Sequence, residues 1–323
     1  MRVVEVSEYG DPSVMRITQR PRPTPTGNEV RIDVARAGVN FADIEKRRGN
    51  YPDGPTPPYV PGIEVSGTID ATGDDVDRQI GEEVTAIIEG GGYAEYAVTT
   101  VDRLIEIPVG MDLATAVALP VQFLTAHNTL FEWGSLELGE RVLVHAAAGG
   151  VGTAAVQLAH QAGATVFGTA STVEKLSVAS KLGVTHPIDY TTADVAAVID
   201  DITDGEGVDL VLDGVGGDAF YASVDALADC GRIVVYGMAS GNIPTVATPR
   251  LFFENQSLLG YHLGHAIEHA PDRVHTGIRT LTDRLETEEY TVEIDREIPL
   301  TEVMDAHKAL ASRDTIGKTV LVP

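Results

Sequence analysis

The segment between residues 141 and 162 constrains the fold of this chain more than any other part. The mostly apolar run Arg141–Ala146 predicts a short buried strand, and Val151–Ala162 predicts the helix that follows it. The turn between them reads Ala-x-Gly-Gly-x-Gly over residues 147–152, a spacing typical of a turn that binds a dinucleotide. Alanine at position 147 replaces the first glycine of the usual fingerprint. The segment therefore predicts a strand, a glycine turn and a helix at a dinucleotide site.

Two glycines of this turn have separate physical roles. Gly149 lets the backbone approach a pyrophosphate closely, and Gly152 lets the helix pack against its strand, because neither carries a side chain. The amides of the first helical turn lack partners within the helix and favour a bound anion. A glycine fingerprint alone is weak, so the next strand has to support it.

The second strand, Thr165–Ala170, ends without an acidic residue. Proteins that bind NAD usually place Asp or Glu there, about twenty residues after the turn, to hold the ribose hydroxyls. This chain has Ser171 and Thr172 instead, with Lys175 one turn into the next predicted helix. A hydroxyl and a lysine suit a 2′-phosphate, which a carboxylate would repel. We therefore expect NADPH rather than NADH; the alternative is that Ser171 only caps the helix and Lys175 is solvated.

Length and the order of elements predict two domains, because 323 residues are many for one hydrophobic core. Residues 1–114 contain short alternating segments and predict a mostly β domain. Residues 115–263 alternate strands with helices, which predicts a doubly wound parallel sheet. Residues 264–323 include an expected strand at Thr291–Ile294 and an expected helix at Thr301–Ser312. We expect this last part to return to the first domain.

The charge of the chain is strongly negative. The formal net charge is −25, and only five of the 23 basic residues are lysine, the other 18 being arginine. An acidic surface that is poor in lysine is a device of halophiles, where salt screens the self-repulsion. We expect a salt-loving source, and the alternative is an ordinary acidic protein. The same field disfavours nucleic acid and anionic membranes as partners.

A single cysteine, Cys230, excludes an intrachain disulfide and a four-thiolate zinc lobe. The first residues lack the apolar stretch of a signal peptide, and the most apolar long window contains glycines and polar residues that suit a buried strand–turn–helix. We expect a cytoplasmic protein without membrane insertion.

Nine segments in register give the chain its resemblance to a known family. They are Gly38–Asp43, Arg48–Tyr51, Pro61–Gly67, Gly91–Tyr96, Leu119–Ala126, Ala146–Gly152, Asp213–Gly217, Gly231–Gly237 and Ile316–Val322. Together they resemble the zinc-free quinone oxidoreductase (zeta-crystallin-like) branch of the medium-chain dehydrogenase/reductase superfamily, over nearly the whole chain. The resemblance implies an α/β fold, with a GroES-like, mostly β catalytic domain plus a doubly wound Rossmann domain that binds NADPH.

The zinc alcohol dehydrogenases of the same superfamily are the main rival. Their catalytic metal needs a cysteine where this chain has Asn40 and a histidine where it has Ile63. Glu64 alone cannot hold the metal. We therefore expect no metal site, and we interpret the histidines at 262, 265 and 269 as surface or interface groups.

The acceptor expected from the resemblance is a quinone or another conjugated carbonyl compound, which takes a hydride without a Lewis acid. Asn40, Tyr51 and Thr125 match residues that line the acceptor groove, with Thr125 near the nicotinamide. The alternative is structural: Asn40 caps a turn and Tyr51 closes the groove by packing.

The expected cofactor contacts come from the same resemblance. The pyrophosphate would face Gly149, Gly150, Val151 and Gly152; the 2′-phosphate would face Ser171, Lys175 and Tyr190; Gly237 and Met238 would flank the nicotinamide ribose; Lys318 would lie near the cofactor entrance.

Three functions stay open from the sequence. We expect a cytoplasmic NADPH-dependent quinone oxidoreductase that forms a homodimer, with an enone or 2-alkenal reductase as the close alternative. The second possibility is a non-catalytic NADPH-binding protein, including one that binds RNA. The third is a zinc alcohol dehydrogenase.

Overall fold

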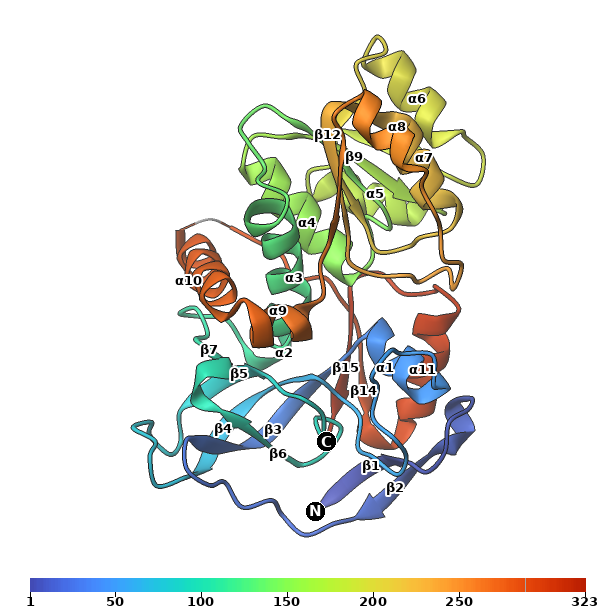
Figure 1. The fold of residues 1–323 in the computed structure, drawn as a ribbon. Coiled ribbons are helices and arrows are strands. Elements are labelled where there is room, and N and C mark those ends of the chain that lie inside the picture. The colour runs from blue at the N-terminus through green and yellow to red at the C-terminus, as the bar shows by residue number, and fades with distance from the viewer. Residues whose placement is uncertain (288) are drawn as a thin grey trace. The chain divides into compact units, whose positions relative to one another are not determined.

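The computed structural model describes residues 1–287 and 289–323, which form two compact units (Figure 1). One unit comprises Met1–Val121 with Thr282–Pro323, and the other comprises Gln122–Leu281. The predicted functional division, 1–114 with 264–323 against 115–263, stays a prediction.

The Gln122–Leu281 unit is built on a six-stranded parallel sheet. Its strands are β8 (Arg141–Val144), β9 (Thr165–Ala170), β10 (His186–Asp189), β11 (Val208–Asp213), β12 (Leu227–Val235) and β13 (Ser257–Gly260). The spatial order is β10-β9-β8-β11-β12-β13, and all neighbours are parallel. The order reverses between β8 and β11, and in doubly wound sheets a ligand is expected at the carboxyl ends of the strands at this point.

Helices connect the strands of this sheet. They are α4 (Gly150–Gln161), α5 (Val173–Lys181), α6 (Val195–Ile202), α7 (Asp218–Ala226) and α8 (Thr248–Phe253), followed after β13 by α9 (Leu263–His269) and α10 (Pro271–Thr287). Before β8, α3 (Leu124–His127) lies between two π-helical turns, Leu119–Phe123 and Asn128–Glu132. Buried apolar side chains such as Leu143, Phe167 and Ile233 form the core on the sheet.

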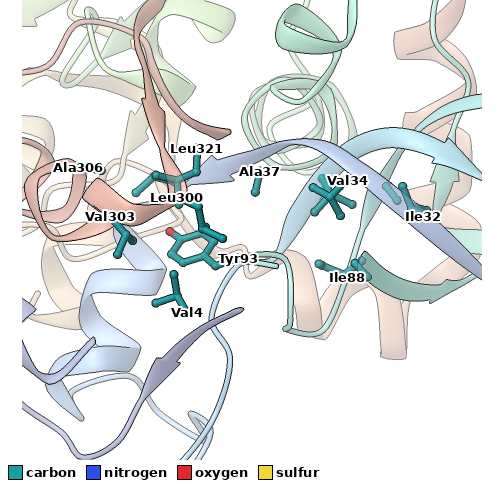
Figure 2. Close-up of a cluster of buried hydrophobic side chains, with 14 of the residues drawn as sticks. Val4, Ile32, Val34, Ala37, Ile88, Tyr93, Leu300, Val303, Ala306 and Leu321 are labelled. Atoms are coloured by element: carbon teal, nitrogen blue, oxygen red, sulfur yellow. The ribbon is translucent and has the colours of Figure 1, made fainter. Parts of the chain in front are cut away.

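The first unit is mostly β. Its seven-stranded sheet has β14 (Ile294–Pro299), β15 (Lys318–Val322), β3 (Glu29–Val39), β4 (Glu64–Thr72), β5 (Glu83–Ile87) and β7 (Leu104–Ile105) in this order, and β6 (Tyr96–Thr100) also pairs with β3. The strands β1 (Arg2–Val6) and β2 (Met15–Gln19) form a separate antiparallel pair. Its helices are α1 (Phe41–Arg48), α2 (Leu113–Ala116) and α11 (Val303–Ala311). Figure 2 shows the core, where the ring of Tyr93 lies between Val4 and Leu300. The predicted fold class is confirmed.

One local prediction in this unit is wrong, and one helix was not predicted. The strand expected at Thr291–Ile294 begins only at Ile294 and continues to Pro299, because its parallel pairing with β15 decides its extent. The mostly β prediction for residues 1–114 did not locate α1, which forms at Phe41–Arg48. The backbone amide of Asn40 donates to the Asp43 carboxylate at its first turn, and Gly49, at φ 80°, ends it. A helix of eight residues among strands leaves too short a periodic pattern to find.

Candidate active site

The glycine turn between β8 and α4 is tightly packed at its backbone. Gly149 is the N-cap of α4, and its amide donates to the carbonyl of Ala146 at 2.8 Å. A Cβ on Gly152 would collide with the same carbonyl oxygen, so α4 packs on the end of β8 only because residue 152 has no side chain. The first-turn amides of α4, at Gly150, Val151 and Gly152, have no acceptor within the helix and suit an anion.

Gln122 is a residue at this turn that the sequence reasoning missed. Its side chain is buried, and its amide packs so closely on Gly150 that a Cβ there would collide with it. The position lies in the Leu119–Ala126 segment that carries the resemblance, which was the available signal. A side chain at position 150 would therefore displace the Gln122 amide from its place on the turn.

Of the three residues expected at a 2′-phosphate, two follow neighbouring strand ends and one lies in the next helix. Ala170 of β9 pairs with Asp189 of β10, so Ser171 and Tyr190 follow side by side, and the Tyr190 amide donates to the carbonyl of Ala170 at 3.3 Å. Lys175 lies in the first turn of α5. The cap of α5 is Thr172, whose hydroxyl accepts from the Lys175 amide at 3.2 Å, so Ser171 does not cap this helix.

One carboxylate does lie next to this group, at the end of β10. The hydroxyl and the amide of Thr191 donate to Asp189 at 2.7 and 2.9 Å, and these two bonds lower the pKa of Asp189. The carboxylate is thereby held by its own loop. The strand after the glycine turn, β9, ends in Ala170 and offers no acid to a ribose.

Gly237 and Met238 follow β12 at the same edge of the sheet. The Tyr236 amide donates to the carbonyl of Asp213, and a Cβ on Gly237 would lie 2.8 Å from the carbonyl oxygen of Gly214. The loop therefore stays against β11, with Met238 exposed. All the predicted cofactor residues of this unit thus lie at the carboxyl ends of its strands.

A buried histidine supports that edge and was also missed. His145 follows β8, and its Nδ1 and Nε2 lie 3.0 Å from the Thr169 hydroxyl and 2.9 Å from the Ser223 hydroxyl. Burial lowers the pKa of His145, so the ring is neutral at neutral pH. Thr125, one of the expected acceptor residues, is buried in α3 of the same unit.

The other two expected acceptor residues belong to the first unit. Asn40 precedes α1, and its side-chain Nδ2 donates to Glu64 at 2.8 Å, while its Oδ1 accepts from Lys318 at 3.0 Å. Tyr51 lies in the loop after α1, half-buried, with the Lys46 ammonium 5.1 Å from its ring centroid. Burial, reinforced by the Asp43 carboxylate, raises the pKa of Tyr51, so its hydroxyl stays protonated at neutral pH.

A buried hydrogen-bonded chain lies behind Asn40. The Asp43 carboxylate accepts from the backbone amide of Asn40 at 3.0 Å and from the Tyr93 hydroxyl at 3.1 Å. The Tyr93 hydroxyl lies 3.3 Å from Nε2 of His307, and Arg47 donates to Nδ1 of His307 at 3.3 Å. Burial raises the pKa of both Asp43 and Tyr93, whereas burial and then the Arg47 charge lower the pKa of His307 to about 3.

The residues around Asn40 and Glu64 do not fit a zinc ion. Ile63 offers no donor atom, and the Glu64 carboxylate is already bonded to the Lys318 ammonium. Among the described residues, no three His, Cys, Asp or Glu side chains are grouped so that they could hold a metal ion. Within residues 1–287 and 289–323, no helix combines the length and apolar character that crossing a bilayer requires.

Comparison with known proteins finds a matching family for each of the two units. Residues 26–109 match the alcohol dehydrogenase GroES-like domain family, and residues 150–282 match the zinc-binding dehydrogenase family. The synaptic vesicle membrane protein VAT-1 homolog of Danio rerio is 35% identical over 99% of this chain and 69% of its own length. A quinone oxidoreductase of Pseudomonas aeruginosa is 33% identical over 99% of each chain.

Solved structures agree over the full length. The mycobacterial protein Rv1454c, solved with NADPH, superposes with a TM-score of 0.93 at 33% identity and covers 100% of both chains. The Escherichia coli quinone oxidoreductase, also solved with NADPH, gives 0.92 at 28% identity and 100% of both chains. The CurK enoyl reductase gives 0.91 at 31% identity, over 99% of this chain and 98% of its own.

A GroES-like domain followed by a doubly wound dinucleotide domain defines a nicotinamide-dependent dehydrogenase or reductase. The relatives and solved structures that match over the full length show to which branch of this class the chain belongs. The chain belongs to the quinone oxidoreductase (zeta-crystallin-like) branch of the medium-chain dehydrogenase/reductase superfamily.

Proposed function

We propose that the protein is an NADPH-dependent quinone oxidoreductase that transfers hydride without zinc. The observation that carries the proposal is the pairing of two features. One unit has a glycine turn, with Ser171 and Tyr190 at adjacent strand ends and Lys175 in the first turn of α5. The other unit has an asparagine, Asn40, bound to a lysine and a glutamate where a metal enzyme of the superfamily needs a cysteine.

The cofactor is NADPH, which supplies the hydride when bound. The amides at Gly149, Gly150, Val151 and Gly152 receive its pyrophosphate at the start of α4. Ser171, Lys175 and Tyr190 receive the 2′-phosphate, since they supply two hydroxyls and one cation. Gly237 and Met238 flank the nicotinamide ribose.

Hydrogen-bond donors take the place of a Lewis acid for the acceptor. The side-chain amide of Asn40 and the protonated Tyr51 hydroxyl orient the carbonyl oxygen of the acceptor and stabilise the negative charge that forms there. Thr125 lies near the nicotinamide and helps position the acceptor. A conjugated carbonyl spreads the accepted electrons, so it needs less polarisation than an alcohol or a simple ketone.

Loss of NADPH absorbance tests the reaction directly. Purified protein in high salt is mixed with NADPH and either an ortho-quinone or a 2-alkenal, with and without a metal chelator. We expect faster turnover of the quinone and no effect of the chelator. No turnover of any quinone or alkenal by folded, NADPH-saturated protein would refute the proposal. Loss of activity with the chelator, together with metal found by elemental analysis, would instead favour a zinc alcohol dehydrogenase.

An enone reductase is the second candidate, because the CurK enoyl reductase covers the same length of chain at 31% identity. The ratio of quinone to alkenal turnover in the same assay separates the two. A non-catalytic role is the third candidate. A filter-binding measurement at working salt tests its RNA-binding form, which the charge of −25 disfavours.

A homodimer is part of the proposal, and β13 is the edge through which we expect it to form. Among the described strands, β13 is paired only with β12, and Leu258 on it and Phe252 and Phe253 just before it are exposed. Two copies can join edge to edge and bury these side chains. Light scattering should give a dimer, and Leu258→Lys a monomer. The control Leu138→Lys, at another exposed leucine, should stay dimeric.

The setting of the enzyme completes the proposal. A cytoplasmic location suits a chain whose single cysteine is an exposed free thiol. A halophilic source suits an acidic surface with few lysines.

A further inference from the structure

Lys318 lies at an unusual place for a lysine. The chain has five lysines, and Lys318 has a side chain with no exposure to solvent, at the start of β15 in the first unit. Burying an ammonium costs several kcal/mol unless close partners compensate it. Its partners therefore indicate what it does.

The three donors of the ammonium match three acceptors. Nζ contacts the Glu64 carboxylate, the Oδ1 atom of Asn40 at 3.0 Å and the carbonyl of Val39 at 3.3 Å. With these contacts made, no donor of Lys318 is left for a phosphate. The expectation that Lys318 contacts the cofactor therefore has a competing explanation within its own unit.

Glu64 is equally buried and equally occupied. Its Oε1 also accepts from Nδ2 of Asn40 at 2.8 Å, and its Oε2 accepts from the backbone amide of Val121 at 2.9 Å. A carboxylate and an ammonium thus contact the two ends of one amide. Of the three side chains, only Asn40 retains any exposure, 8%.

The two charges fix which way the Asn40 amide points. A lysine can only donate and an ionised carboxylate can only accept, so Oδ1 must face Lys318 and Nδ2 must face Glu64. The flipped amide would place oxygen against carboxylate and nitrogen against ammonium. The second hydrogen of Nδ2 is then held in one direction, away from Glu64.

We propose that Lys318 and Glu64 are a positioning pair that fixes Asn40 as a hydrogen-bond donor to the acceptor. The inference rests on the proposed function, in which Asn40 meets the acceptor carbonyl. Lys318 then acts on the acceptor through Asn40 and makes no contact with NADPH. The cation of a lysine side chain holds the carboxylate that a metal would otherwise approach.

The test removes both charges together. Lys318→Met alone leaves Glu64 buried without its cation and is expected to unfold readily. Lys318→Met with Glu64→Gln keeps the shape, and the neutral glutamine no longer dictates the orientation of the amide. Lys308→Met, at an exposed lysine of α11, is the matched control. NADPH affinity is read by fluorescence titration, and kcat is read with the quinone.

We expect the double variant to bind NADPH as the wild type does and to lose roughly tenfold in kcat, the size of one hydrogen bond. Asn40→Ala should cost the same factor in the wild type and less than about twofold in the double variant, because the donor is already misplaced. Unchanged kcat, or weaker NADPH binding that accounts for the whole loss, would overturn the inference.

Failure of the proposed function is distinguished by a second readout. The side-chain amide protons of Asn40 can be followed by NMR in the cofactor-bound protein without any acceptor. We expect slow exchange with water in the wild type and in Lys308→Met, and faster exchange in the double variant. If the wild type reduces no acceptor, the function is wrong, and the amide exchange still decides the positioning. Equal exchange in all three proteins would contradict it.

Discussion

At the scale of single residues, the contact between Arg47 and His307 decides the tautomer of that histidine. A guanidinium can only donate, so Nδ1 of His307 accepts from it, and the neutral ring carries its hydrogen on Nε2. Nε2 then donates to the Tyr93 hydroxyl, which donates to Asp43. Hydrogen bonds that all run in one direction thus join the buried Arg47 guanidinium to the buried Asp43 carboxylate. Asp43 in turn accepts from the backbone amide of Asn40.

The lowered pKa of His307 predicts that the folded state loses stability in acid. The pKa of His307 is lowered to about 3 in the folded protein, by burial first and by Arg47 second, against 6.5 in the unfolded chain. Below pH 6.5, His307 is protonated in the unfolded chain and stays neutral in the folded protein. The free energy of unfolding therefore decreases as the pH is lowered from 6.5 to about 3. The slope contributed by His307 is at most about 1.4 kcal/mol per pH unit.

Denaturant unfolding of His307→Gln across this pH range measures that contribution. Glutamine can still accept from Arg47 and donate to Tyr93, but it does not titrate. We expect a shallower loss of stability toward low pH, with the contribution of His145 unchanged. An equally steep slope in His307→Gln would contradict the assignment.

Lys175 allows a second test at this scale. Lys175→Ala removes the cation proposed for the 2′-phosphate, so KM for NADPH should rise about tenfold or more while KM for NADH hardly changes. Steady-state kinetics with both cofactors gives the ratio. Lys181→Ala, at the far end of α5, is the control. An unchanged preference would refute the role of Lys175.

At the scale of elements, the packing of α4 on β8 depends on one missing side chain. Gly152→Ala would drive a methyl group into the Ala146 carbonyl, so the helix must shift. We expect a loss of about 1–3 kcal/mol in stability, and weaker NADPH binding because the first-turn amides move with the helix.

Thermal unfolding and NADPH titration of Gly152→Ala check both effects. Gly90→Ala is the matched control, since its Cβ would lie at an ordinary 3.5 Å from the nearest atom, the carbonyl oxygen of Val60. Wild-type affinity in Gly152→Ala would show that the close approach of helix and strand is not needed for the cofactor.

Elements with strong local patterns were predictable from the sequence, and their neighbours in space were not. The predicted strand Thr165–Ala170 agrees with β9, and the predicted helix Thr301–Ser312 contains α11, because local apolar patterns and turn residues define both. The extent of β14 depends on its partner strand, and α1 on a contact between Asn40 and Asp43.

The candidate site shows the same limit more sharply. Asn40 and Lys318 were each singled out, for separate roles, yet Lys318 bonds to Asn40 and to Glu64, which is 254 residues away. Tyr93 and His307 are 214 residues apart. Periodicity reports which face of an element is buried, and it carries no information about such distant polar pairs.

At the scale of the whole molecule, charge should govern stability. The net charge of −25 produces self-repulsion that salt screens, the Debye length falling from about 10 Å at 0.1 M to about 3 Å at 1 M. We expect the melting temperature to rise over this range of KCl. Replacing the exposed Glu8, Asp201 and Glu286 by lysine brings the formal charge to −19 and should reduce the response. An equal response in both proteins would contradict a repulsive origin.

The close packing of Gly38 on Glu64 and Lys318 restricts how the sequence can evolve. A Cβ on Gly38 would lie 2.6 Å from Cε of Lys318, so the lysine is enclosed by a residue that cannot be enlarged. A lineage acquiring zinc here would need new ligands at 40 and 63 and also the removal of Lys318. Losing Lys318 first would leave the buried Glu64 carboxylate without its cation, and gaining ligands first would leave the ammonium bound to the same carboxylate. A zinc site at this place would therefore require several coupled substitutions rather than one.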